Sequence, residues 1–262
     1  MAGRRRLRWL VAATVAWGVL LAGLAWWSVR HDPPTVREQR SLSQAGPVVD
    51  GAVGRLVAAV DGEAWELTPA QVRRGCRLTP LADGAALTQG LDVLVAEGSE
   101  QALLERVAQR LPADWRAGVR TGSEGPRLRA DAGDFITIDG RTVADGRVRL
   151  SAMTGCRPAD VEYADLLPEH PLGDELAAAL RALGRPAPTG ADAVVVARCP
   201  TGGKARTIRV AAGVGPLAPL RPLGAALVDR PEVYAYWSGP VVVLAVAGGD
   251  QLQLAASTGC AG

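Results

Sequence analysis

The sequence predicts an α+β protein: an N-terminal transmembrane helix, then two related α-β-β-α-β-β-β modules with antiparallel sheets and one disulfide each. Three observations predict this architecture. An uncharged apolar run lies near the N-terminus, a nine-residue segment ending in Thr-Gly-Cys occurs twice, and four cysteines are spread over the rest of the chain. The chain has 262 residues, 48% of them apolar, which is enough to form a core in one large domain or two small ones.

The apolar run extends from Trp9 to Val29, 21 residues without a charged side chain. At about 1.5 Å per residue, a helix of this length crosses the roughly 30 Å hydrocarbon core of a bilayer. Four arginines precede the run, and Trp9, Trp26 and Trp27 lie at its ends, where indole rings favour the headgroup region. We therefore expect a cytoplasmic tail at residues 1–8 and a lipid-contacting transmembrane helix at residues 9–29.

A cleaved signal peptide is the competing interpretation of this segment. The charged start, the apolar run and the small residues Gly23 and Ala25 would suit a cleavage site. We favour an uncleaved anchor because the apolar run continues past Ala25 into the tryptophan pair. Either way the remainder is exported, so the expected location is the cell membrane, with a single pass, a cytoplasmic N-terminus and an extracellular C-terminal domain.

The charge distribution argues against nucleic acid as a partner. The net charge of +2 includes five arginines and no acid within residues 1–30. Removing those five leaves 24 basic and 27 acidic side chains, a net charge of −3 for the exported part. A nucleic-acid-binding domain needs a basic face that replaces the counterions of phosphate groups.

The four cysteines, Cys76, Cys156, Cys199 and Cys260, all lie in the exported part. An even number of cysteines in an oxidising compartment predicts disulfides. Three pairings are possible, and the internal repeat favours Cys76–Cys156 and Cys199–Cys260, one per module. The sequence has no CxxC motif and no histidine near a cysteine, so a metal site or a redox-active pair is disfavoured.

The internal repeat sets the module boundaries. The segments VRLSAMTGC (148–156) and LQLAASTGC (252–260) agree at five of nine positions. We expect a polar stalk at residues 30–44, a first exported module at 45–157 and a second at 158–262.

In the first module, apolar spacing predicts a helix from Pro47 to Val60 and then a strand leading into Cys76. A turn at Asp83-Gly84 should precede a strand over 86–96, and Ser99 should cap a helix that ends before Pro112. Strands are expected at 116–121, 128–138 and 147–153, with Asp145-Gly146 as the turn before the last of them.

In the second module, leucines at helical spacing predict a helix over 172–183. Strands are expected at 193–199, 205–211, 232–237, 241–247 and 251–256, with turns at Gly202-Gly203 and at 248–250. The middle helix should be reduced to a short helix after Pro222, because prolines interrupt the segment.

No motif assigns catalytic, cofactor-binding or metal-binding residues. Gly202-Gly203-Lys204 lacks the remaining residues of a phosphate loop, so a hairpin turn is the simpler interpretation. His31 and His170 lie in separate regions, and no serine lies in a GxSxG elbow that His170 could serve.

Acidic and aromatic residues leave two further alternatives open. Paired acids could cleave glycosidic bonds, although solvated turns explain them more simply; the candidates are Asp131, Asp134, Asp139, Glu162, Asp165 and Glu169. Tyr234 and Tyr236 lie on one face of a strand and could bind a sugar or a peptide, although core packing is favoured.

The run LAWWSVRHDPPTVREQRSL, the segment LPADWRAGV and the two Thr-Gly-Cys endings resemble uncharacterised single-pass membrane-anchored exported proteins of high-GC actinobacteria. The resemblance implies the topology and an envelope location, and it implies no activity.

The sequence therefore predicts a non-enzymatic binding or accessory module on the outer face of the membrane, with an envelope protein or polymer as its partner. An exported hydrolase acting on cell-wall material is one alternative. The other is an accessory subunit recruited through a small-residue face of the transmembrane helix, which would include Gly18, Ala22 and Ala25.

Overall fold

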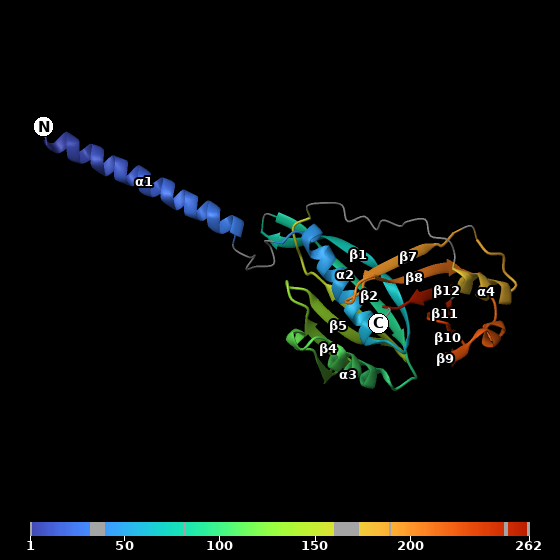
Figure 1. Ribbon diagram of the computed structural model, residues 1–262. Coiled ribbons are helices and arrows are strands. Elements are labelled where there is room, and N and C mark those ends of the chain that lie inside the picture. Colours follow the sequence, from blue (N-terminus) through green and yellow to red (C-terminus); the bar gives the residue numbers. More distant parts are fainter. Residues whose placement is uncertain are drawn as a thin grey trace.

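The computed structural model describes residues 2–31, 40–80, 82–159, 173–188, 190–248 and 251–260. An N-terminal helix, α1 (Ala2–His31), stands apart from a body formed by the described residues between 40 and 260 (Figure 1). The body contains two six-stranded antiparallel sheets.

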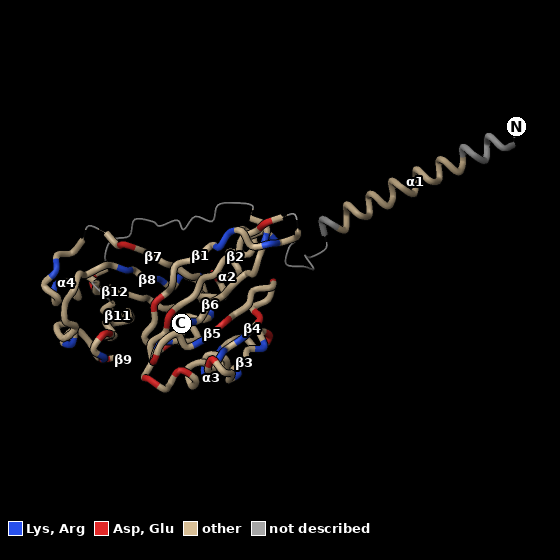
Figure 2. Tube along the Cα trace, turned by 180° about the vertical axis from the view of Figure 1, so that it is seen from behind, with Lys and Arg blue, Asp and Glu red and all other residues tan. Residues whose placement is uncertain are grey.

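Helix α1 contains a stretch, Trp9–Ser28, that is long enough and apolar enough to cross a membrane. The side chains of this stretch are exposed, and Figure 2 shows no charged residue along it. The helix extends beyond the predicted 9–29 segment at both ends. A large apolar surface without protein packing requires lipid or another helix to cover it.

Helix α2 (Leu42–Ala59) begins five residues before the predicted start at Pro47. The reason is a capping box, in which the Gln44 amide donates to the Ser41 hydroxyl at 3.4 Å and the Ser41 amide donates to the Gln44 side chain at 3.1 Å. The predicted stalk therefore ends at Ser41 rather than at residue 44, and its residues 32–39 lie outside the described part of the chain.

The first sheet has the strand order β1-β2-β6-β5-β4-β3. Helices α2 and α3 (Glu100–Arg110) pack on one of its faces. The 3₁₀ turn η2 (Ala113–Trp115) connects α3 to β3. The strands are β1 (Ala64–Thr79), β2 (Ala82–Leu94), β3 (Gly118–Gly122), β4 (Gly125–Asp131), β5 (Thr137–Ala144) and β6 (Arg147–Met153).

Three predictions for this module are corrected by the structure. Four strands follow α3 rather than three, because the predicted strand 128–138 is the end of β4, a turn and the start of β5. Asp83 and Gly84 lie within β2, paired with Arg77 and Cys76, rather than in a turn. Ser99 precedes α3, but its side chain makes no capping hydrogen bond.

The second sheet has the order β7-β8-β12-β11-β10-β9, which is the order of the first sheet with each number raised by six. Helix α4 (Asp174–Ala182) lies on one face together with η3 (Ala218–Leu223). The strands are β7 (Ala193–Arg198), β8 (Lys204–Ala211), β9 (Ala225–Arg230), β10 (Val233–Ser238), β11 (Val241–Gly248) and β12 (Gln251–Thr258).

The segment around Pro222 differs from its prediction. Instead of a short helix after Pro222, a 3₁₀ helix contains this proline, and strand β9 follows. The 3₁₀ helix tolerates proline because few of its amides need an intrahelical acceptor.

The two modules share a continuous apolar core. Val195, Ala197 and Ala205 of the second sheet belong to the cluster that α2 and the first sheet form. Val242, Leu244 and Ala255 pack with Ala64 and Leu94 in a second cluster between the modules. The face of the second sheet opposite α4 is therefore buried against β1 and α2.

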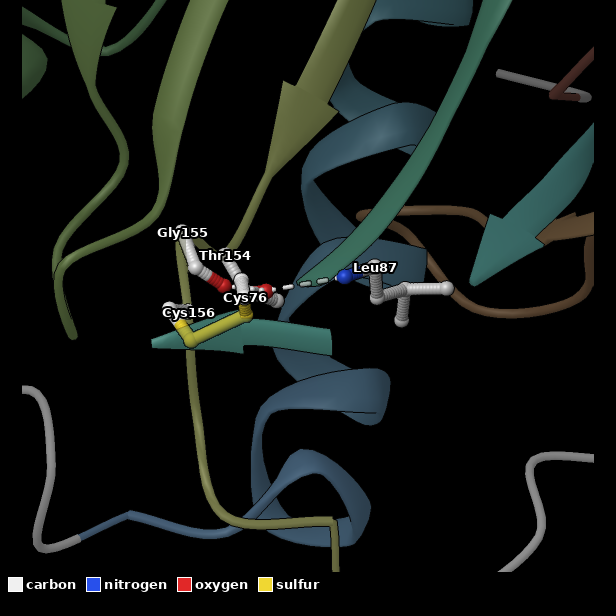
Figure 3. The surroundings of a disulfide bond; sticks show 5 residues. All are labelled: Cys76, Leu87, Thr154, Gly155 and Cys156. Carbon is white, nitrogen blue, oxygen red and sulfur yellow. Dashed lines mark hydrogen bonds between the residues drawn. A yellow bond between two sulfur atoms is a disulfide. The ribbon is translucent and has the colours of Figure 1, made fainter. Parts of the chain in front are cut away.

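Disulfides join Cys76 to Cys156 and Cys199 to Cys260, the pairing that the repeat predicts. Figure 3 shows the first, next to Thr154 of the Thr-Gly-Cys segment. The buried Thr154 hydroxyl accepts from the Leu87 amide at 3.0 Å, and it donates to the Gly155 carbonyl at 2.7 Å. The threonine side chain thus continues the pairing of β2 and β6 up to the disulfide.

Candidate functional site

The helix-free face of the first sheet carries a charged pocket of about 460 Å³. Side chains alternate along a strand, so those that point away from α2 and α3 all lie on this face. Arg209 and Gln253 of the second sheet also line the pocket, so both modules form it. Its charged residues are Glu66, Asp92, Arg127, Asp139, Arg141, Arg147, Arg149 and Arg209.

Asp92 lies at the centre of an ion-pair network. Its side chain is 2% exposed; it accepts from Arg149 at 2.7 and 2.8 Å and from Arg147 at 2.6 and 3.1 Å. Burial raises the pKa of Asp92, but the hydrogen bonds and charges of Arg149 and Arg147 outweigh burial and hold the pKa below its ordinary value. Asp92 therefore stays ionised, with both oxygens occupied by guanidinium donors.

Glu66 is the cross-strand partner of Asp92 in the β1–β2 ladder. Arg209 of β8 donates to it at 3.0 Å, and Arg147 donates at 3.4 Å. Burial raises the pKa of Glu66 above its ordinary value, and the charges of Arg209 and Arg147 oppose this without overcoming it. Arg209 also donates to the Leu67 carbonyl at 2.6 Å, so a side chain of the second module forms part of the pocket wall.

Asp139, on β5, is the third carboxylate of the pocket. Arg127 donates to it at 2.6 Å, and Arg129 lies 3.8 Å away. Its side chain is 6% exposed, so its negative charge is directed at these arginines rather than at solvent. Each carboxylate in the pocket is therefore held by at least one arginine.

Four arginines, Arg149, Arg141, Arg127 and Arg120, form a row across β6, β5, β4 and β3. Each is the direct cross-strand partner of the next. Direct partners in an antiparallel sheet project from the same face. Arg149 and Arg127 bind carboxylates, whereas Arg141 and Arg120 are exposed and form no ion pair with a residue that the structure describes. We call these four residues the arginine row.

The other acids suggested by the sequence do not lie in the pocket. Asp131 accepts from the Gly133 amide at 3.0 Å and lies 3.5 Å from Arg116. Asp134 pairs with Arg40 at 2.9 Å. Both belong to the β4–β5 turn region, as the turn interpretation predicts. Glu162, Asp165, Glu169 and His170 lie outside the described residues.

The tyrosines on β10 belong to the core of the second module. Tyr234 and Tyr236 are 2% and 1% exposed, with ring centroids 5.7 Å apart. Burial raises the pKa of Tyr236 to about 12. The packing interpretation is thus confirmed, and these rings do not form an open sugar-binding or peptide-binding surface.

The turn interpretation of Gly202-Gly203-Lys204 is also confirmed. Gly202 and Gly203 both have positive φ between β7 and β8, and Lys204 begins β8. Because residues with a side chain rarely adopt a positive φ, glycine suits these two positions of the hairpin.

Reasoning from the sequence missed Glu66, Asp92, Arg209 and the arginine row. A local signal existed for part of the arginine row, since Arg147 and Arg149 alternate with apolar residues on the predicted strand 147–153. Arg127 and Arg129 alternate in the same way at the start of the predicted strand 128–138. No local signal could bring Arg209 to Glu66, because 143 positions separate them.

Comparison with known proteins found no matching family model, no matching curated protein and no matching solved structure. Among the described residues, no group of three or more histidine, cysteine, aspartate or glutamate side chains is placed to hold a metal ion.

Proposed function

We propose that this protein is a membrane-anchored, exported binding protein, and that its binding site is the charged pocket on the first sheet. The apolar helix α1 supports membrane attachment, and two disulfides support an oxidising, extracytoplasmic location for the body. The resemblance to anchored exported proteins of actinobacteria agrees with this location and remains a prediction.

The observation that carries the proposal is the state of the pocket's carboxylates. Arg149 and Arg147 form ion pairs with Asp92, and Arg127 forms an ion pair with Asp139. The lowered pKa makes Asp92 a weak base, and both carboxylates fix the direction of the arginines that bind them. The arrangement therefore favours recognition of a ligand by pre-oriented charged groups over proton transfer.

The two modules also hold the pocket rigid. Arg209 spans the interface, and the buried Thr207 hydroxyl accepts from the Leu67 amide at 2.9 Å. Gln89 of the first module donates to the Val196 carbonyl of the second at 3.0 Å. A pre-organised site loses little conformational entropy when it binds.

Photo-cross-linking in native membranes tests the proposal with the full-length chain. A photoreactive residue replaces Ser151 in the pocket, and matched variants carry it at Arg181 on α4 or at Val15 on α1. We expect a defined adduct from position 151 that is absent from position 181. No adduct at 151, or equal adducts at 151 and 181, would contradict a binding site in the pocket.

The exposed surface of α1 favours a second candidate, an accessory subunit recruited through its transmembrane helix. Gly18, on the predicted small-residue face with Ala22 and Ala25, has no atom within 4 Å of an added Cβ, so a partner helix could approach closely there. An adduct from position 15 alone, lost when α1 is exchanged for an unrelated anchor, would support this function instead.

An exported hydrolase is favoured by one observation, the opposite pKa shifts of the neighbours Glu66 and Asp92. Both acids are ion-paired with arginines, which argues against a role in proton transfer. Release of sugars from cell-wall material by the wild type, abolished in Glu66→Gln with the fold intact, would establish hydrolysis.

A further inference from the structure

The arginine row brings together like charges that a sheet would ordinarily separate. Arg141 stands directly opposite Arg149 on one side and Arg127 on the other, and Arg127 stands opposite Arg120. Like charges in direct cross-strand pairs destabilise a sheet. Asp92 and Asp139 relieve the repulsion at Arg149 and Arg127, but Arg141 and Arg120 have no carboxylate partner among the described residues.

A second hollow continues the positive surface beyond the pocket. It has a volume of about 720 Å³, lies over β3, β4 and β5, and shares Arg127 and Arg141 with the first pocket. Its one acidic lining residue is Glu124. Five arginines line it: Arg116, Arg120, Arg127, Arg129 and Arg141. The two hollows therefore meet along the arginine row, on a body whose overall charge is slightly negative.

We propose that the arginine row binds a linear phosphate-bearing polymer of the cell envelope, which lies across the strands from β6 to β3. This inference rests on the proposed function, because it names the ligand of the same face. Neighbouring strands lie about 4.8 Å apart, so the four arginines extend over about 14 Å. A row of this length matches several successive anionic groups of a chain better than one small anion.

Phosphate fits this row better than carboxylate does. A guanidinium fork binds either group in bidentate fashion, but a phosphate group offers more acceptor oxygens. The side chains of Arg149, Arg141 and Arg127 start from adjacent strands, so more than one fork can share a single phosphate. Asp92 and Asp139 act as positioning residues, since each holds one arginine of the row in place.

The test uses the full-length protein in nanodiscs of zwitterionic lipid and a fluorescent linear polyphosphate as the probe. Arg120→Gln with Arg141→Gln removes the two unpaired charges of the row. The matched control is Arg73→Gln with Arg181→Gln, which removes two exposed charges elsewhere. Anisotropy titrations at low and at physiological salt give the affinity and its salt dependence for each protein.

We expect the row variant to lose about tenfold or more in affinity and the control less than about twofold. The slope of log affinity against log salt concentration is negative, and its magnitude should decrease by roughly 1.4 to 1.8 in the row variant, since two phosphate contacts are lost. Its melting temperature should equal or exceed that of the wild type, because the change removes repulsion rather than a contact.

Four results would overturn the inference. Equal losses in both variants would show attraction by net charge alone. Binding of polyglutamate as tight as that of polyphosphate would refute the phosphate assignment, and full competition by equimolar inorganic phosphate would refute a polymer site. If polyphosphate does not bind while position 151 still gives its specific adduct, the ligand assignment fails and the proposed binding function stands.

Discussion

Gly54 lies where α2 touches the second module, and replacing it with alanine should force the modules apart. A Cβ at this position would lie 1.8 Å from the carbonyl oxygen of Arg198 and 2.6 Å from its carbonyl carbon. Contact distances for such atoms are about 3.5 Å, so α2 and β7 must separate by more than about 1 Å. The hydrogen bond that the Arg198 amide donates to the Asp50 carboxylate, 3.1 Å long, crosses the same contact and would weaken.

The expected change in the free energy of unfolding is the sum of two opposing effects. Overpacking against backbone costs about 3 kcal/mol, and replacing a helical glycine returns about 1 kcal/mol. The net loss of about 2 kcal/mol corresponds to a decrease of roughly 4 to 8 °C in melting temperature for a body of this size.

Gly51→Ala is the matched control, three residues earlier on the same helix, where no atom lies within 4 Å of the added Cβ. It should raise the melting temperature by a few degrees through helix propensity alone. Circular dichroism of the full-length variants in detergent gives both values. If Gly54→Ala is as stable as Gly51→Ala, the contact between α2 and β7 does not exist and the shared core is wrong.

Three further predictions concern charge, covalent bonds and topology. Asp92→Asn should cost about 2 kcal/mol at pH 7, because Arg149 loses its carboxylate partner and Arg147 keeps only the longer contact to Glu66, while both arginines remain partly solvated. The folded pKa of Asp92 is low, so its stabilisation is present above the unfolded value of 3.8 and is lost as pH falls below it. Denaturant titrations of wild type and variant should therefore converge in acid, and a constant difference would contradict the ion-pair account. Replacing Cys199 and Cys260 by serine should cost about 4 kcal/mol, measured by thermal unfolding, because the disulfide closes a loop with a sequence separation of 61; non-reducing peptide mapping that links Cys76 to Cys199 would refute the pairing. Protease added outside intact cells should digest the body and leave the N-terminus intact, whereas recovery of a chain that begins after Ala25 would show a cleaved signal peptide.

Elements with a clear local signal were predicted well from the sequence. Strand β6 matches its predicted range, because alternation along 147–153 and the Asp145-Gly146 turn both define it. The division between β4 and β5 was missed because Ile136 and Ile138 are both buried, which resembles one continuous strand. The turn between these strands has Gly133, Asp134 and Phe135 at positive φ. Gly133-Asp134 is a turn signal that the prediction passed over, whereas Phe135 gives no such signal.

The candidate site depends on long-range pairing, which local patterns do not reveal. The Asp92–Arg149 contact and the arginine row exist because β2 pairs with β6, β6 with β5, β5 with β4 and β4 with β3. The sequence showed arginines at alternate positions, but the register that aligns them across four strands comes from the folded sheet.

The sheet face opposite α2 and α3 in the first module and the sheet face opposite α4 in the second are used differently, which has a consequence for stoichiometry. In the second sheet this face carries Val242, Leu244 and Ala255 and is covered by the first module, whereas in the first sheet it carries the charged pocket. A chain whose two sheets have the same strand order thus presents one such face rather than two. Under the proposed binding function, each copy should therefore saturate with a single ligand, and avidity for a long polymer would have to come from several copies side by side rather than from the two sheets within one chain.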